Sequence, residues 1–336
     1  MFKKGVNAMN KKKKNKKNDY ETKEEKAERR KKSNYKSWEE QLDKIEKHMR
    51  KNSINTRYDY RKKIEVFAKF MTENYDVKKF ANISNKHLEA FVKEQKEKGN
   101  TDKYIKGCLS AVRSYHNEID GKYNLTNDNS ELGVGRVSYK DSVRRWSQNE
   151  IDKCKEIARG LGRTDVVSAV TLADNAGLRI HEIFKLNTDD VDKQLNKIKE
   201  GEKETLTVKG KNGKIREVEV NEITYSELEK SVNVAKEEGR NKVYMDFENE
   251  KTHKRIKSVQ YFINHHREKF EDKQVMNGRN SSLTFHGIRH HYAENKFQEF
   301  IELGFDKKES CEKVSKLLGH ERDAVTNIYI RRAKEE

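Results

Sequence analysis

One stretch of the chain, residues 204–220, has the residue pattern of a β-hairpin, and the other periodic segments have the pattern of helices. Apolar and polar residues alternate through this stretch on both sides of Asn212 and Gly213, a pair that favours a two-residue type I′ turn. Elsewhere the apolar residues recur at three- and four-residue steps. The sequence therefore predicts a mainly α protein with one small β-hairpin.

The first group of helical segments spans residues 37–125. Thr56, Ser84 and Thr101 each precede an apolar stripe and are suited to cap a helix. The stripes are short, and each is long enough to cover one face of a small core. We expect these residues to form a compact all-α domain.

The second group of helical segments follows a stretch with little periodicity. Residues 126–145 are rich in Asn, Asp, Ser and Gly and predict a linker. Ser147 and Glu150 then have the spacing of a capping box, with an apolar stripe behind them. We therefore expect a second domain over residues 146–336.

The net charge of the chain indicates a polyanionic partner. It is +17 over 336 residues, and 39% of the residues are charged. No apolar run approaches the roughly eighteen residues that a membrane span needs, and the Lys-rich start lacks the apolar segment of a signal peptide. Nucleic acid is therefore favoured over a membrane surface, and we expect a cytoplasmic protein.

Residues 1–36 carry much of this charge, with fifteen Lys and Arg against five Asp and Glu. Because the segment has no apolar period, we expect a basic disordered arm, or a fraying helix, that adds sequence-independent phosphate contacts. The alternative is a solvated tail that only aids solubility.

The cysteines do not indicate a disulfide framework or a metal site. Cys108, Cys154 and Cys311 lie far apart and lack the spacing of metal ligands. We expect reduced, partly buried thiols, and neither a metal ion nor another cofactor.

A group of residue types suited to phosphate chemistry lies near the C-terminal end. It consists of His286, Arg289, His290, His320 and Tyr329. Arginine offers a fixed fork of donors to phosphoryl oxygens, histidine titrates near neutrality, and a tyrosine hydroxyl can be a covalent nucleophile. Each residue alone has an ordinary structural explanation, but together they indicate chemistry on a phosphate group.

Two further candidates lie upstream. Arg179 and Glu182 are three residues apart near the start of a predicted helix, where Glu182 can hold a buried guanidinium in place. The alternative is an ordinary surface salt bridge. Lys211 stands beside the predicted turn, from which its ammonium can reach into a DNA groove. The alternative is a solvated lysine in a basic turn, because Lys209, Lys214 and Arg216 are its neighbours, and Lys209 and Lys214 are the fallback choices for the same role.

In order and spacing, these residues resemble the active site of the tyrosine recombinases, the phage integrase family. The segments concerned are A-G-L-R-x-x-E at 176–182, G-K-x-x-K-x-R-x-V at 210–218, H-x-x-R-H at 286–290 and L-G-H at 318–320, followed by a tyrosine. The resemblance implies a catalytic set of Arg179, Lys211, His286, Arg289 and His320, with Tyr329 as nucleophile and Glu182 and His290 in support.

The resemblance also implies a fold and an activity. The fold would be a two-domain clamp on DNA, an all-α core-binding domain followed by an α+β catalytic domain. The protein would cleave and rejoin duplex DNA at specific sites through a 3′-phosphotyrosyl intermediate, without metal or ATP. It would act as a homotetramer on two DNA sites, associated with the nucleoid, and an accessory DNA-bending protein is compatible with this.

Two alternatives have the same residues or the same fold. A type IB topoisomerase shares the chemistry but relaxes supercoils without joining two sites. A DNA-binding factor could keep the fold without the chemistry, although it would have no use for Tyr329.

Three features depart from the family pattern. Only seven residues follow Tyr329, whereas many members have a longer tail that couples neighbouring protomers. His181 stands where the family often has serine, and Glu219 where it often has proline. We expect the first departure to change how protomers assemble, and the other two to leave the chemistry intact.

Overall fold

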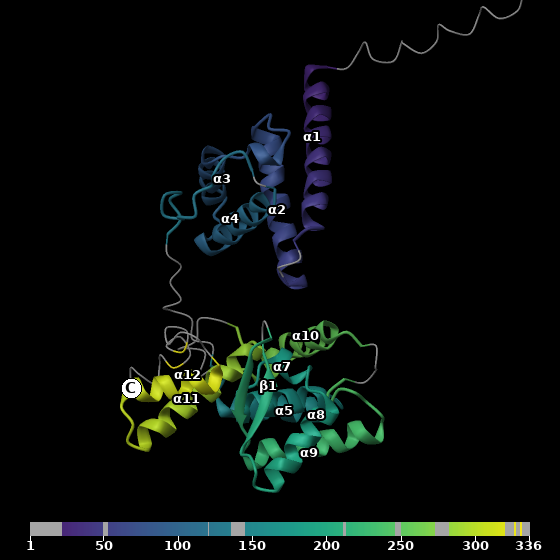
Figure 1. Ribbon diagram of the computed structural model, residues 1–336, viewed down its shortest axis with the longest axis vertical. Coiled ribbons are helices and arrows are strands. Elements are labelled where there is room, and N and C mark those ends of the chain that lie inside the picture. The colour runs from purple at the N-terminus through teal and green to yellow at the C-terminus, as the bar shows by residue number, and fades with distance from the viewer. Residues whose placement is uncertain are drawn as a thin grey trace, which may run out of the picture. The chain divides into compact units, whose positions relative to one another are not determined.

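The chain divides into two compact units, Met1–Ser138 and Tyr139–Glu336 (Figure 1). The computed structural model describes residues 22–49, 53–119, 121–135, 145–210, 213–245, 250–272, 282–319, 326 and 330. The division between the units falls within the expected linker. Each unit has its own hydrophobic core.

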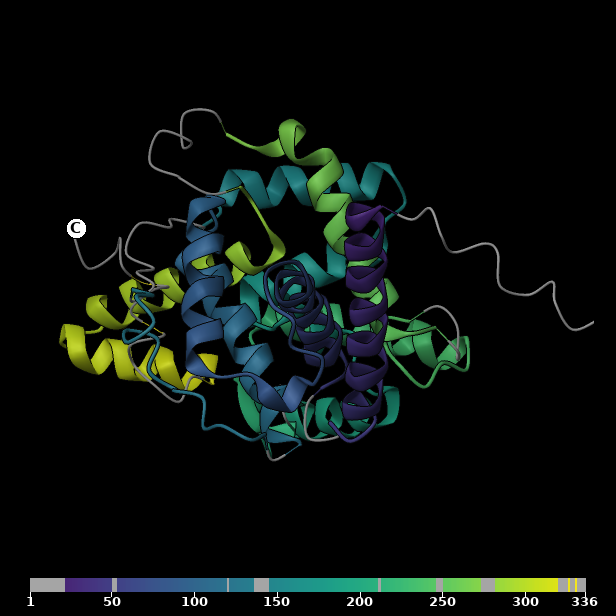
Figure 2. The same ribbon diagram turned by 90° about the horizontal axis from the view of Figure 1, so that it is seen from above.

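Unit 1 is helical in the residues that the structure describes. Its elements are α1 (Lys23–Glu46), α2 (Ile54–Asn74), the short 3-10 helix η1 (Phe80–Asn82), α3 (Asn85–Glu97) and α4 (Asp102–Asn117). α2 packs against both α1 and α4, as can be followed in Figures 1 and 2. Trp38, Phe67 and Phe91 meet in the core with no exposed surface. The predicted all-α domain is therefore confirmed.

The helix starts of unit 1 test the caps named from the sequence. Ser84 and Thr101 are the N-caps of α3 and α4, as predicted. α2 begins earlier than expected, because its N-cap is Ser53, whose hydroxyl accepts a hydrogen bond from the Thr56 N–H. Thr56 therefore lies inside the first turn.

The segment expected to be a disordered arm is helical from Lys23 onward, which corrects the prediction for residues 23–36. Thr22 and Glu25 form a capping box at the start of α1, each side chain accepting from the other's backbone N–H. Arg30 also forms an ion pair with Asp76. A strong local cap and continuity with the buried end of α1 thus extend the helix through a charged segment, while residues 1–21 lie outside the described part.

The expected linker is also shorter than 126–145. Leu132 and Val134 are 5% and 2% exposed and belong to the core of unit 1. The Gly135 N–H donates to Asp102 of α4 over 2.8 Å. The described residues up to 135 therefore belong to unit 1, and residues 136–144 lie outside the described part of the chain.

Unit 2 is mainly helical and contains one β-hairpin, within the residues described. Its elements are α5 (Gln148–Gly160), α6 (Thr164–Ala176), α7 (Ile180–Ile183), α8 (Thr188–Lys199), β1 (Thr205–Lys209), β2 (Ile215–Glu219), α9 (Glu222–Glu237), α10 (Thr252–Phe270), α11 (Phe285–Glu302) and α12 (Lys307–Leu318). α6 is the central helix and packs against α5, α9 and α11. The fold class predicted from the sequence is thus confirmed.

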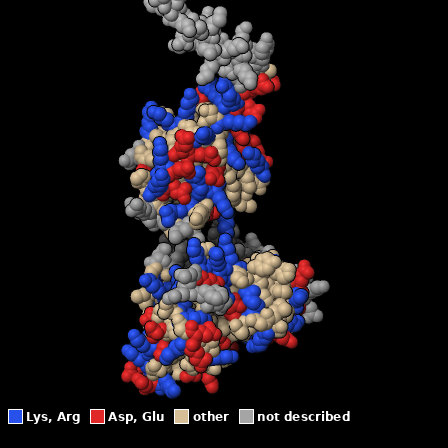
Figure 3. Space-filling model, turned by 90° about the vertical axis from the view of Figure 1, so that its right-hand side faces the viewer, with Lys and Arg blue, Asp and Glu red and all other residues tan. Residues whose placement is uncertain are grey.

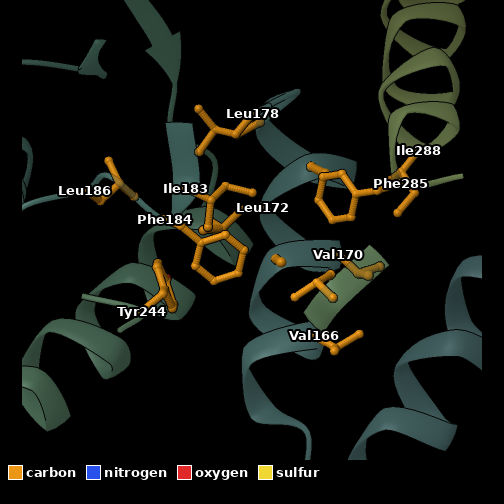
Figure 4. Packing of buried hydrophobic residues seen from close by; sticks show 14 of the residues in the cluster. Val166, Val170, Leu172, Leu178, Ile183, Phe184, Leu186, Tyr244, Phe285 and Ile288 are labelled. Carbon is orange, nitrogen blue, oxygen red and sulfur yellow. The ribbon is translucent and has the colours of Figure 1, made fainter. Parts of the chain in front are cut away.

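The core of unit 2 holds together the segments that carry the candidate residues. Figure 4 shows Leu178 and Ile183, which flank Arg179, in the same apolar cluster as Phe285 and Ile288 of α11. Phe285 and Ile288 are 5% and 0% exposed. Burial of these side chains fixes the Arg179 segment and α11 relative to each other.

A buried tryptophan, Trp146, lies just before α5. The Trp146 ring stacks on Phe270 with centroids 5.1 Å apart, and its Nε1 donates to the Thr284 carbonyl over 2.9 Å. Ser147 and Glu150 form the predicted capping box of α5. The first turn of unit 2 is therefore tied to the segment that leads into α11.

The hairpin is present, but its register corrects the predicted turn. β1 and β2 pair with Lys209 opposite Ile215, and the Gly210 N–H donates to the Lys214 carbonyl over 2.6 Å. This register leaves three residues, 211–213, to close the hairpin instead of two. Gly213 has φ 78°, the conformation that a three-residue loop typically requires at its last position.

The surfaces of both units are highly charged. Figure 3 shows Lys and Arg side chains interleaved with Asp and Glu on the visible face of each unit. Basic and acidic groups are therefore mixed on this face of unit 1 (Figure 3). Among the described residues, no helix has the length and apolar character to cross a membrane.

Candidate active site

Arg179 lies in a tight connection between two helices. Gly177 ends α6 with φ 57°, and Arg179 is the N-cap of α7. The Arg179 guanidinium donates from Nη1 to Glu182 over 2.8 Å and from Nη2 to the Leu318 carbonyl over 3.2 Å. Its side chain remains 23% exposed, so part of the guanidinium is accessible to a ligand.

Glu182 is the carboxylate at the centre of the site. Its side chain is fully buried, which excludes the alternative of a surface salt bridge. It accepts hydrogen bonds from the Arg179 N–H, from Arg179 Nη1 and from Arg216 Nη2 over 2.8, 2.8 and 2.9 Å. Burial raises the pKa of Glu182, but Arg216 and then Arg179 outweigh it and bring the pKa to about 2. Glu182 is therefore ionised at neutral pH.

Arg289 comes from α11 and reaches the same place. It is 1% exposed, and it donates to the carbonyls of Gly177 and Leu318. Arg179 and Arg289 thus share the Leu318 carbonyl at the C-terminal end of α12. Carbonyls at a helix C-terminus lack partners within the helix and carry partial negative charge, so they are suited to hold two guanidiniums.

The structure separates the histidines into exposed and buried ones. His286 is exposed, whereas His290 is 3% exposed beneath it, with ring centroids 5.4 Å apart. This placement fits a substrate contact for His286 and a supporting role for His290. His291 is buried with Arg145 and Asn295 as hydrogen-bond partners, and burial lowers its pKa to about 4. These surroundings give His291 a structural role inside unit 2.

Lys211, His320 and Tyr329 lie outside the described residues. Their flanking residues are placed: Gly210 and Lys214 line an open cavity, together with Arg179, Arg216, Leu317 and Gly319. Gly319 ends α12 with φ 61°. Ile330 is fully buried in the cluster of α11 and α12. The structure thus brings Arg179, Glu182 and Arg289 together and places the neighbours of the other three candidates.

Arg216 was missed as a site residue by the sequence analysis, which treated it only as a basic neighbour of Lys211. It bonds to Glu182 and to the carbonyls of Gly177 and Leu317. The sequence contained one signal for this. Arg216 and Val218 occupy alternate positions of β2, so the arginine points to the core face, where a charge needs a partner.

Gly177→Ala is expected to destabilise unit 2 more than Gly162→Ala. Both glycines have positive φ, 57° and 67°, where a side chain costs about 1–2 kcal/mol. Only at Gly177 would a Cβ meet a neighbour, the Tyr292 ring at 2.6 Å, which adds about 1–3 kcal/mol of overpacking. Urea unfolding followed by Trp146 fluorescence, in a Trp38→Phe background, measures both. An equal loss of unfolding free energy in the two variants would show that the Tyr292 ring moves aside without cost.

Comparisons with known proteins identify the family. Residues 146–336 match the family model described as "Phage integrase family", and residues 36–119 match "Phage integrase, N-terminal SAM-like domain". The two units are thus the N-terminal and catalytic parts of one kind of DNA-strand-exchange enzyme. The chain belongs to the phage integrase family of tyrosine recombinases.

Individual relatives are distant but match most of the chain. Tyrosine recombinase XerC of Roseiflexus castenholzii is 23% identical over 306 residues, which is 86% of this chain and 88% of the relative. A lambda integrase tetramer bound to a Holliday junction has a TM-score of 0.60 at 17% identity, over 87% of this chain and 76% of that one. XerH site-specific recombinase bound to a palindromic difH substrate has a TM-score of 0.59 at 17% identity, over 88% and 81%. These structural likenesses show a shared fold.

Proposed function

We propose that this protein is a site-specific DNA recombinase in which Tyr329 attacks a phosphodiester, forms a 3′-phosphotyrosyl link and releases a 5′-hydroxyl. The covalent link keeps the energy of the broken bond, so rejoining requires neither ATP nor a metal ion. The observation that carries the proposal is the convergence of Arg179 and Arg289, from separate segments, on the Leu318 carbonyl beside the L-G-H motif. Family membership supports the same chemistry.

The two arginines neutralise the charge that builds on the non-bridging oxygens in the transition state. Arg179 lines the cavity and presents the more accessible guanidinium, with 23% of its side chain exposed. Arg289 lies deeper and adds positive potential from below. Glu182 fixes the Arg179 guanidinium in place, so its orientation costs little when substrate binds.

Proton transfer falls to the remaining candidates. A phenol with a pKa near 10 is mostly protonated at neutral pH, so Tyr329 needs assistance. The exposed His286 is the acid or base that assists it. Lys211 protonates the departing 5′-oxygen, and His320 donates a hydrogen bond to the phosphoryl group.

The partner is duplex DNA, and the assembly is a homotetramer on two sites. Support comes from the solved lambda integrase relative, which is a tetramer bound to a Holliday junction. The basic balance of the chain, +17, favours the phosphate backbone as a binding surface. An accessory DNA-bending protein remains compatible with this assembly.

Covalent trapping tests the proposal. We expect the protein, incubated with EDTA and without ATP, to form an adduct with nicked duplexes tiled across the DNA that flanks its gene. The adduct should migrate slowly on a denaturing gel, disappear on protease treatment and leave a free 5′-hydroxyl. Binding in a gel shift without any adduct, on every duplex tested, would favour a non-catalytic DNA-binding factor instead.

A second assay separates recombination from relaxation. On a plasmid with two copies of the cleaved site, a recombinase should give deletion or inversion products, and a plasmid with one copy should give none. A supercoiled plasmid that lacks the site serves as the comparison. If it is relaxed as fast as a plasmid that carries the site, the type IB topoisomerase alternative is favoured.

A further inference from the structure

We propose that Arg216 is a positioning residue that fastens the β-hairpin to the Arg179 segment and to the end of α12, and so sets where the Lys211 loop stands relative to the two arginines. The fastening is a property of the fold alone. Its effect on cleavage rests on the proposed function. Arg216 is not one of the residues that the sequence motifs assign to the chemistry.

The hydrogen bonds of Arg216 join three separate segments. Nη2 donates to Glu182 Oε2 over 2.9 Å and to the Gly177 carbonyl over 3.2 Å. Nη1 donates to the Leu317 carbonyl. Glu182 and Gly177 flank Arg179, and Leu317 lies in the last turn of α12, whereas Arg216 itself belongs to β2. One guanidinium therefore links the hairpin to both of its neighbours in the site.

The stem of Arg216 makes a further contact with the L-G-H motif. A Cβ built on Gly319 would lie 2.6 Å from Arg216 Cδ, which means that the arginine stem lies directly against the Gly319 backbone. Gly319 has φ 61°, so glycine is favoured there for conformation as well as for space. The residue after Gly319 is His320, so the hairpin and this motif meet at the Arg216 side chain.

Arg216 is less accessible than Arg179, and its described hydrogen bonds stay within the protein. Its side chain is 9% exposed, against 23% for Arg179, and its bonds run to groups inside the protein. Within the hairpin it stands opposite Val208, on the face that also carries Val218. The two strands extend from this point to the loop of residues 211–213. A shift of Arg216 therefore also shifts the strand ends at Lys209 and Ile215, between which Lys211 lies in the sequence.

Arginine is required here for its shape as well as for its charge. Three acceptors in different directions suit a planar fork with five donors, whereas a lysine ammonium is a compact point charge on a flexible stem. Arg216→Lys keeps the charge beside Glu182 but cannot reach all three acceptors at once. We expect the substitution to loosen the hairpin without leaving Glu182 unpaired.

The first measurement is hydrogen–deuterium exchange, which needs no catalytic activity. In Arg216→Lys the amides of residues 205–209 and 215–219 should exchange at least about tenfold faster than in wild type, while those of α6 stay unchanged. The matched control is Arg255→Lys on α10, because Arg255 is also largely buried, 12% exposed, and paired with Asp165 and Glu250. If Arg216→Lys is unfolded by circular dichroism, Arg216→Gln takes its place.

The second measurement asks whether the loosened hairpin acts through the lysine. At saturating protein, Arg216→Lys should form the adduct about 100-fold more slowly, as expected for a displacement near 1 Å, with DNA affinity within about threefold of wild type. A substrate with sulfur at the 5′-bridging position has a leaving group that needs no proton. On this substrate the loss should shrink to about tenfold or less, because the misplaced lysine is no longer needed.

The outcomes separate this proposal from the proposed function. Unchanged hairpin exchange in Arg216→Lys overturns the fastening role, whether or not wild type cleaves DNA. Faster exchange with no adduct from wild type keeps the fastening role and removes the proposed function. An equal loss of rate on the oxygen and sulfur substrates shows that Arg216 does not act through the lysine loop, and overturns that part of the proposal.

Discussion

Replacement of Tyr329 by phenylalanine is expected to abolish covalent attachment to DNA and to leave DNA binding within about threefold of wild type. The substitution removes one oxygen and keeps the aromatic ring, so the nucleophile is lost with little change in packing. Loss of a nucleophile costs on the order of 10⁴-fold or more in rate. Single-turnover adduct formation on the nicked duplex measures it, with a gel shift for binding.

The control for this experiment is another tyrosine of unit 2. Tyr261 on α10 is 67% exposed, so Tyr261→Phe removes an accessible hydroxyl and should leave adduct formation unchanged. Tyr292 is near the arginines but unsuited to attack, since it is 3% exposed and burial raises the pKa of its hydroxyl. An adduct that persists in Tyr329→Phe, mapped by mass spectrometry to a different tyrosine, would contradict the assignment of the nucleophile.

The site was predictable where its members are close in sequence or belong to a motif. Arg179 and Glu182 are three residues apart, so one local argument placed them in contact. Arg216 belongs to the G-K-x-x-K-x-R-x-V segment, but its role escaped because its partners, Glu182 and Leu317, are 34 and 101 residues away and the motif does not state what the arginine contacts. No local pattern states that these segments meet. The one indication of a buried partner was that Arg216, a charged residue, occupies a core-facing position of the hairpin.

The errors in the predicted fold have a similar origin. Caps at Ser84, Thr101 and Ser147 were predicted correctly, because a cap depends on residues within one turn. The start of α1 was missed because a basic composition was weighed above the capping box of Thr22. Leu132 was assigned to a linker because its burial depends on tertiary contacts that no short window reveals.

Glu182→Gln is expected to lower the free energy of unfolding of unit 2 by about 3–5 kcal/mol at neutral pH. The carboxylate is fully buried between Arg179 and Arg216, and removing one partner of a buried ion pair leaves uncompensated charge. Trp146 fluorescence in a Trp38→Phe background follows the urea unfolding of unit 2, because the chain has only two tryptophans. The control is Glu217→Gln on the same hairpin. Its carboxylate is 51% exposed, so the pair with Lys203 should contribute no more than about 1 kcal/mol.

The pH dependence gives this prediction a definite sign. The pKa of Glu182 is about 2 in the folded protein, below its ordinary value of 4.5, because Arg216 and Arg179 outweigh the effect of burial. The stabilisation of the folded protein by the ionised Glu182 carboxylate is therefore fully present above about pH 4.5 and is lost as the pH falls toward 2. Glutamine does not titrate. The difference in free energy of unfolding between wild type and Glu182→Gln should therefore shrink by about 3 kcal/mol over that range, at roughly 1.4 kcal/mol per pKa unit. A gap that stays constant down to pH 3 would mean that packing around Glu182, and not its charge, holds the two arginines in place.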